Sequence, residues 1–258
     1  MKDGLRNVGS WVVLILVFIF LYNFFEPGGP VTEVFRGLLL LLVVGTVAIN
    51  VRHGKRFRLG LELNAEGSVL MSRGRIAAAL EKFEAARPLL KKQRFVLDFN
   101  VGLCHLYLWR LHEAERELMS AQGAKELPED IRKLLPPRLA LVSALQGEEG
   151  EARERLEESR RVDSEVEPLT VLAEGAMACR RGEWAEARRL LEGPGTHSLG
   201  GPLRGLRDAL LAWSVEQTRG ERRYVDPVTV FGEASIDSLR EAWPELVDFL
   251  LERARQVV

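Results

Sequence analysis

Four histidines and two cysteines are the side chains of this 258-residue chain best suited to bind a metal ion or act as nucleophiles. His105 and His112 are seven positions apart on two different predicted helices, and no cysteine or carboxylate at ligand spacing completes a zinc site. His53 lies in a basic stretch, and His197 lies in a glycine-rich loop. We therefore expect no metal site and no cofactor.

The two cysteines fall on the predicted first helices of two different helical repeats. A disulfide between Cys104 and Cys179 would have to span a whole repeat, and cysteines with Cα atoms more than about 7 Å apart cannot be bridged. We expect both to be small apolar core residues. This cysteine usage fits a reducing compartment.

Motifs of phosphate binding and hydrolysis are absent from the sequence. It contains no Gly-x-Ser-x-Gly, Walker A, His-Glu-x-x-His or Gly-x-Gly-x-x-Gly segment. The run Gly147–Asp163 is dense in Glu and Arg, but such residues three or four apart on a helix normally form solvated surface pairs. We therefore expect the chain not to be an enzyme, the alternative being an active site built from scattered residues.

The net charge of the chain bears on which kind of partner it binds. The net charge of −1 gives no reason to expect a nucleic acid. Arginine outnumbers lysine, with 29 Arg against 7 Lys, a bias typical of high-GC bacterial genomes.

The N-terminal region is strongly apolar. Val8–Phe25 carries no charged residue, and its eighteen residues would span roughly 27 Å as a helix, close to the hydrocarbon thickness of a bilayer. A second apolar run, Val34–Val51, has Arg36 near its start, and the link Glu26–Glu33 is rich in Pro and Gly. The pattern predicts a two-helix transmembrane hairpin. A cleaved signal peptide and a buried soluble hairpin are the alternatives, but no small-x-small cleavage site follows the first run.

Charged flanks predict the orientation of this hairpin. Lys2 and Arg6 precede the first run, and the connecting link holds no Lys or Arg. The basic residues after the second run are Arg52, Lys55, Arg56 and Arg58. The positive-inside rule then places both termini in the cytoplasm, with the protein in a bacterial inner membrane. The same four residues are candidate contacts for anionic lipid, or they serve only as the topology signal.

Beyond residue 58 a helical unit recurs every 35 residues or so. Its anchor alanines are spaced by 35, 38 and 35 positions, and each is preceded by a small residue and a turn residue and followed by an apolar residue four positions later. The anchors are Ala79, Ala114, Ala152 and Ala187. Such a period predicts a solenoid of helical hairpins, in which small residues at 67, 102, 140 and 175 let paired helices approach closely. Pro136-Pro137 predicts a shortened first helix in the third unit.

These units resemble the tetratricopeptide repeat family. The segments that carry the resemblance are GRIAAALEKFEAA (74–86), WRLHEAERELMSA (109–121), GEEGEARERLEES (147–159) and GEWAEARRLLEGP (182–194). It covers about Leu59–Pro194, and it departs from the family where Asp98 and Pro136 replace a large apolar residue. The resemblance implies an α-solenoid whose first helices line a concave groove that binds other proteins.

Carried onto this chain, the groove is mostly apolar, which suits a partner's apolar helix or peptide. The positions that we expect to bind a partner are Phe99, Leu103, Leu106, Tyr107, Leu141 and Leu145. The alternative is a groove filled by the protein's own chain, since an exposed apolar surface of this size favours aggregation.

The C-terminal region offers such a filler. After a glycine-rich loop, Leu203–Arg219 reads as a helix that stops at Gly220, and Tyr224–Ala234 reads as irregular. A last amphipathic helix is predicted over Ile236–Val257, broken or kinked at Pro244. We expect these helices to cap the solenoid; a partner-facing role for the last helix is the alternative.

The sequence thus predicts an all-α protein of three parts: a transmembrane hairpin with its basic segment (1–58), four repeats (59–194) and a helical cap (195–258). We expect a membrane scaffold that docks other proteins at the cytoplasmic face of the membrane, with lipid and protein partners. The alternative is a structural subunit that braces a multi-protein envelope complex.

Overall fold

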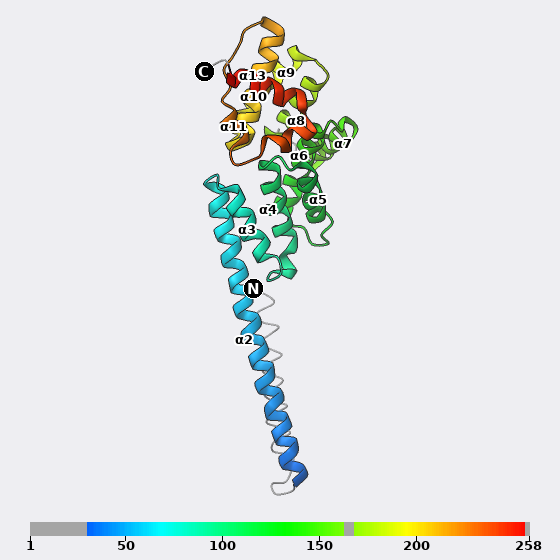
Figure 1. Ribbon diagram of the computed structural model, residues 1–258. Coiled ribbons are helices and arrows are strands. Elements are labelled where there is room, and N and C mark those ends of the chain that lie inside the picture. The colour runs from blue at the N-terminus through cyan, green and yellow to red at the C-terminus, as the bar shows by residue number, and fades with distance from the viewer. Residues whose placement is uncertain (1–29, 163–167, 256–258) are drawn as a thin grey trace. The chain divides into compact units, whose positions relative to one another are not determined.

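The computed structural model describes residues 30–162 and 168–255, except for the side chains of residues 30–36, 38, 39, 254 and 255. All regular structure in these residues is helical, which confirms the predicted all-α class (Figure 1). The helices are α2 (Pro30–Ser72), α3 (Ile76–Ala86), η1 (Lys91–Gln93), α4 (Arg94–Tyr107), α5 (Leu111–Gln122), α6 (Glu129–Gln146), α7 (Glu149–Val162), α8 (Pro168–Arg180), α9 (Trp184–Glu192), η2 (Pro194–Thr196), α10 (Gly201–Arg219), α11 (Pro227–Phe231), α12 (Ile236–Ala242) and α13 (Pro244–Arg255).

The chain divides into two compact units, Met1–Arg58 and Leu59–Val258. The described part of the first unit is helical from Pro30, so the last residues of the predicted link are helical, as suits a proline in a first helical turn. The predicted first span, residues 8–25, lies outside the described residues. Within the described residues, no helix offers an apolar stretch long enough to cross a bilayer.

The second unit is a solenoid-like stack of antiparallel helix pairs. The pairs are α2 with α3, α4 with α5, α6 with α7, and α8 with α9, and α10 follows (Figure 1). Three of the tight turns inside these pairs have a glycine with positive φ: Gly74 at +76°, Gly147 at +87° and Gly182 at +72°. The turn between α4 and α5 has Trp109 at φ +56° instead.

Small residues allow the two helices of a pair to touch, as the period predicts. A Cβ placed on Gly67 would lie 2.7 Å from the ring of Phe83, and one on Gly102 would lie 2.8 Å from Leu118. In each case the large residue comes sixteen positions after the glycine, on the second helix of the pair. The repeat therefore follows from one packing contact used again in successive pairs.

Helix α6 corrects one prediction. It runs unbroken from Glu129 to Gln146 with Pro136 and Pro137 inside it, so the prolines do not shorten the helix. Two interior prolines remove two helical hydrogen bonds, at about 3 kcal/mol each. Buried side chains on both prolines and on Leu139 to Leu145 offset that cost, because each large apolar side chain contributes roughly 1.5–3 kcal/mol on burial.

The buried apolar side chains form two clusters. The larger joins α4 through α13, and the smaller lies between α3, α4 and the end of α2. Cys104 belongs to the smaller cluster and Cys179 to the larger, and both are buried and unpaired, as predicted. Burial raises the pKa of the Cys104 thiol to about 12 and that of Cys179 to about 11. Both thiols are therefore protonated and inert at neutral pH.

The C-terminal region differs from the prediction in one element. Helix α10 ends at Gly220, and the last helix breaks at Pro244, both as predicted. The stretch predicted to be irregular contains α11, which begins where the Asp226 carboxylate accepts a hydrogen bond from the Val228 N–H. An aspartate followed by proline is a helix-start signal, and the prediction overlooked it.

Candidate functional site

The predicted groove residues lie in the core of the second unit. Leu106, Leu141 and Leu145 have no exposed surface, and Phe99 and Leu103 are each 7% exposed. Tyr107 is partly buried and packs against both core clusters. In this conformation, these side chains pack against other residues of the same chain. A partner-binding role for them stays a prediction.

A cavity of about 370 Å³ remains between the first helices of the pairs. Met71 of α2, Tyr107 of α4, Leu169 of α8 and Leu203 of α10 line it, together with Arg138 of α6. Its walls combine apolar side chains with Ser72, Ser198 and Arg138, and burial raises the pKa of the Tyr107 hydroxyl. The cavity is the part of the predicted concave surface that a ligand or peptide side chain could enter.

Arg138 is the only charged residue among those that line this cavity. Its guanidinium donates a hydrogen bond of 2.6 Å to the Leu134 carbonyl, and it lies 5.7 Å from the centre of the Phe99 ring. Both contacts hold the side chain in a fixed orientation.

Residues 224–236, which we call the strap, bridge two walls of the cavity. On one side, the Glu233 carboxylate accepts a hydrogen bond of 2.8 Å from the Ala77 N–H, in the first turn of α3. On the other, α11 lies beside α10, where a Cβ on Gly205 would come within 2.2 Å of the Thr229 carbonyl oxygen (Figure 1). The strap therefore contacts both the first helix pair and α10, which are far apart in the sequence.

Trp109 attaches the strap to the second helix pair. Its indole N–H donates a hydrogen bond of 2.8 Å to the Val230 carbonyl, and its side chain is completely buried. A bulky residue with positive φ is strained by about 1–2 kcal/mol. Three other pairs have a glycine in this turn. Trp109 is less favourable there in its backbone conformation, but its side chain gains a hydrogen bond to the strap.

Arg180 joins α12 to the third and fourth pairs. Its guanidinium donates hydrogen bonds to the carbonyls of Ala144 (3.0 Å), Leu145 and Ala242 (2.8 Å), and it stacks 4.2 Å from the ring centre of Trp243. Burial lowers its pKa from the ordinary arginine value. A cation that binds three backbone carbonyls at once fixes the C-terminal helices on the ends of α6 and α8.

Asp98, one of the departures from the family pattern, has a structural role. It is 2% exposed, pairs with Arg87 at 2.7 Å and accepts a hydrogen bond of 2.8 Å from Ser120. Arg87 also pairs with Glu117, and the Glu117 side chain raises the pKa of Arg87 against the opposing effect of its burial. This ionic cluster holds the end of α3 against α4 and α5.

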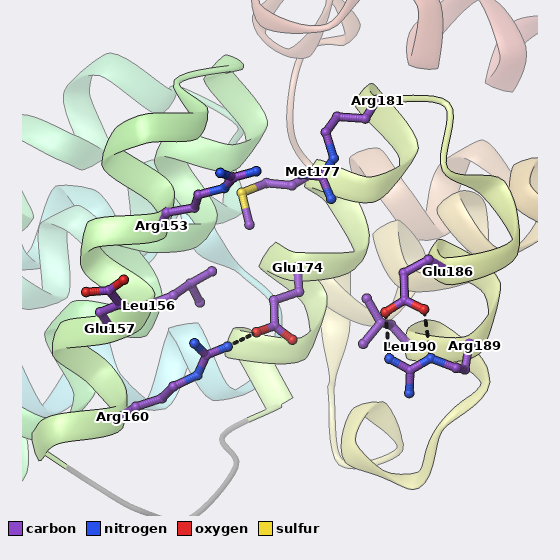
Figure 2. Close-up of a pocket in the computed structure, with 10 residues that line it drawn as sticks. All are labelled: Arg153, Leu156, Glu157, Arg160, Glu174, Met177, Arg181, Glu186, Arg189 and Leu190. Atoms are coloured by element: carbon purple, nitrogen blue, oxygen red, sulfur yellow. Dashed lines mark hydrogen bonds and ion pairs between the residues drawn. The ribbon is translucent and has the colours of Figure 1, made fainter.

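A second space, a cleft of about 480 Å³, separates α7 from α8 and α9. Figure 2 shows Leu156 and Arg160 of α7 facing Met177 and Glu174 of α8 across it. Arg160 pairs with Glu174, and the other arginines that line the cleft also have carboxylate partners. Each arginine of the lining is therefore already paired with a carboxylate.

Three carboxylates come together at the third pair. Glu115, Glu148 and Glu151 each place an oxygen within 4.8 Å of the others, and partial desolvation and the nearby Glu115 raise the pKa of Glu148. Gln146 lies 3.0 Å from His112 beside them. Glu148 and Glu151 are exposed, and solvated acidic groups of this kind carry no implication of a metal.

The candidate lipid-contacting residues are exposed. Arg52, Lys55, Arg56 and Arg58 lie on α2, and none forms an ion pair with the described residues. They follow directly on the apolar segment 40–51 of the same helix.

No protein-family model, curated protein or solved structure matches this chain. The class that the described residues define is an all-α protein built from stacked antiparallel helix pairs.

Proposed function

We propose that this protein is a membrane-anchored helical-repeat scaffold that docks partner proteins at the cytoplasmic face of a bacterial inner membrane. The observation that carries the proposal is the exposed apolar surface of α2. Leu41 is 70% exposed, Leu42 60% and Ile49 58%, and their neighbours from residue 40 to residue 51 are similar.

This segment is apolar on every side. A helix of that kind is typical of a lipid environment or of the interior of a large protein, and not of water. Each such side chain gains roughly 1.5–3 kcal/mol when it leaves water. The four exposed basic residues that follow suit anionic headgroups, at about 1 kcal/mol each near the surface. We propose that the segment inserts together with the apolar run at residues 8–25.

Docking is supported by the cavity among the first helices of the pairs, whose lining includes Met71, Leu169 and Leu203. Solenoids of helix pairs present concave surfaces of this kind to other proteins, and an amphipathic helix or an apolar peptide matches the lining. The tetratricopeptide resemblance points the same way.

A second function, bracing of a multi-protein envelope complex, is favoured by the burial of the predicted groove residues. Five of the six are at most 7% exposed, so these side chains are used in packing within the second unit. Under that function, the protein holds other subunits by its outer surfaces and is degraded in their absence.

A photo-crosslinking residue in place of Tyr107 distinguishes the two functions. The full chain is irradiated in intact membranes, and the same residue in place of the exposed Lys125 serves as the control. Docking predicts a crosslinked polypeptide from position 107 that is absent at position 125 and is competed by the unlabelled wild-type chain. Crosslinks only within the chain at position 107 would rule out docking at the cavity and leave bracing.

A further inference from the structure

The segment that joins α3 to α4 is strongly basic (Figure 1). Residues 87–94, which we call the basic turn, read Arg-Pro-Leu-Leu-Lys-Lys-Gln-Arg and contain no acidic residue. Lys91 and Lys92 are exposed, and neither has an ion-pair partner in the part of the chain that the structure describes. The Arg94 side chain is 67% exposed and lies 3.5 Å from the Asp98 carboxylate. Three cationic side chains of the basic turn therefore face solvent.

The backbone of the basic turn is held in place by hydrogen bonds and by burial. The N–H groups of Leu89 and Leu90 both donate to the Ala86 carbonyl, at 2.9 and 3.1 Å, and the Gln93 N–H donates to the Leu90 carbonyl at 2.9 Å. The Leu90 side chain is 3% exposed and belongs to the smaller core cluster. The cationic side chains thus extend from a fixed backbone.

The basic turn packs against the part of α2 that opens the second unit. A Cβ on Gly60 would lie 2.7 Å from Leu90 Cγ and 2.9 Å from Leu89 Cβ, so the missing side chain of Gly60 allows this close contact. Gly60 follows Arg58 by two residues. Chain length alone therefore keeps their Cα atoms within about 7 Å, whatever the arrangement of the two units. The basic turn is tied in this way to the end of the basic run at residues 52–58.

We propose that Lys91, Lys92 and Arg94 contact the same anionic lipid surface as the basic run at residues 52–58. This proposal rests on the membrane anchor proposed above. Like the basic turn, the basic run has four Lys or Arg and no acidic residue. Anionic headgroups attract such clusters within a Debye length, about 8 Å at physiological salt. The first helix pair then meets the membrane at a second point, beside the anchor itself.

Quenching of a fluorophore by labelled lipid headgroups tests this contact. Gln93→Cys places a thiol next to Lys92 without changing the charge of the basic turn, and a nitrobenzoxadiazole label is attached to it in the full chain. Cys104 and Cys179 are buried and protonated, so they stay unlabelled. The chain is reconstituted in phosphatidylcholine vesicles that carry headgroup nitroxides, with or without phosphatidylglycerol.

Ser72→Cys provides the matched control position. Ser72 is exposed and lies twelve residues after Gly60 on α2, which places it about 18 Å further along the helix. Its label should be quenched less than the label at position 93, and phosphatidylglycerol should not change that quenching.

Phosphatidylglycerol should raise the quenching at position 93. Adding Lys91→Gln and Lys92→Gln should reverse the rise, because each near-surface base strengthens the contact by about fivefold, or about 25-fold for the pair. About 1 M salt should act in the same direction, since it shortens the Debye length to about 3 Å. Both lysines are exposed, so their replacement leaves the fold intact, which circular dichroism checks.

Equal quenching at positions 93 and 72 would overturn the proposal. So would quenching at position 93 that responds neither to phosphatidylglycerol nor to the two lysine replacements. Flotation of the same vesicles reports the anchor separately. A chain that floats without quenching at position 93 refutes only the lipid contact, whereas a wild-type chain that does not float with the vesicles overturns the anchor and the contact together.

Discussion

The indole N–H of Trp109 donates a hydrogen bond to the carbonyl of Val230, 121 positions later in the chain. This bond links the turn of the second helix pair to the strap. It also accounts for a tryptophan with positive φ where three other turns have glycine. The strain at residue 109 is tolerated because the side chain gains complete burial and a satisfied donor.

Trp109→Phe should lower the free energy of unfolding by about 1–3 kcal/mol, because it leaves the Val230 carbonyl without its donor in a buried site. Trp109→Gly should relieve the turn but cost more, about 3–5 kcal/mol, because it leaves a large cavity. Urea unfolding of the full chain in micelles measures both. Trp213→Phe is the control: no hydrogen bond from its indole is found among the described residues, and equal losses at 109 and 213 would refute the role of the bond.

Gly205→Ala and Gly150→Ala should have opposite effects on stability. A Cβ at residue 205 would collide with the Thr229 backbone, so we expect a loss of about 1–3 kcal/mol. Gly150 lies in α7 with nothing within 4 Å, so alanine should gain about 0.5–1 kcal/mol from helix propensity. Thermal or urea unfolding shows the signs, and a stabilised Gly205→Ala variant would mean that α11 does not pack on α10 as described.

Arg180→Lys should be costly, although it keeps the charge. A lysine ammonium cannot bind the carbonyls of Ala144 and Ala242 together while stacking on Trp243, so about 2–4 kcal/mol of stability should be lost. Arg181→Lys, next along the chain, changes only solvated ion pairs and should stay within about 0.5 kcal/mol. Similar effects at the two positions would show that Arg180 does not fix α12.

The stability of the second unit should fall in mild acid because of His105. Burial lowers its pKa below the ordinary value near 6.5; Glu113, Glu117 and Glu84 oppose that shift, while Arg110 adds to it. The unfolded chain then binds a proton that the folded chain does not. The free energy of unfolding is highest above about pH 6.5 and declines as the pH falls through the lowered folded-state value.

His105→Gln should flatten this decline in urea unfolding series between pH 7.5 and roughly 5. His197→Gln, at an exposed loop position, should leave it unchanged. An unaltered slope in the His105→Gln variant would assign the acid sensitivity to other groups.

The sequence period predicted the helix pairs because one contact repeats. Gly67 with Phe83 and Gly102 with Leu118 are local in the sequence, so spacing alone reveals them. The buried state of Phe99 and Leu103 was not accessible in this way, because it depends on tertiary packing such as that of the Phe99 ring against Arg138 of α6. Trp109 stands where the other repeats have glycine, and this departure indicated that its side chain makes a contact of its own. The sequence near Glu233 or Arg180 contains no pattern that predicts their distant hydrogen-bond partners.

Alkaline carbonate extraction of membranes from cells that express the full chain tests the membrane anchor most directly. The account predicts that the wild-type chain stays in the membrane pellet. A chain carrying Leu41→Asp, Val44→Asp and Val47→Asp should be released in part to the supernatant, because charged side chains at these positions are costly in hydrocarbon while the run at residues 8–25 is unchanged. Release of the wild-type chain by carbonate would contradict the account.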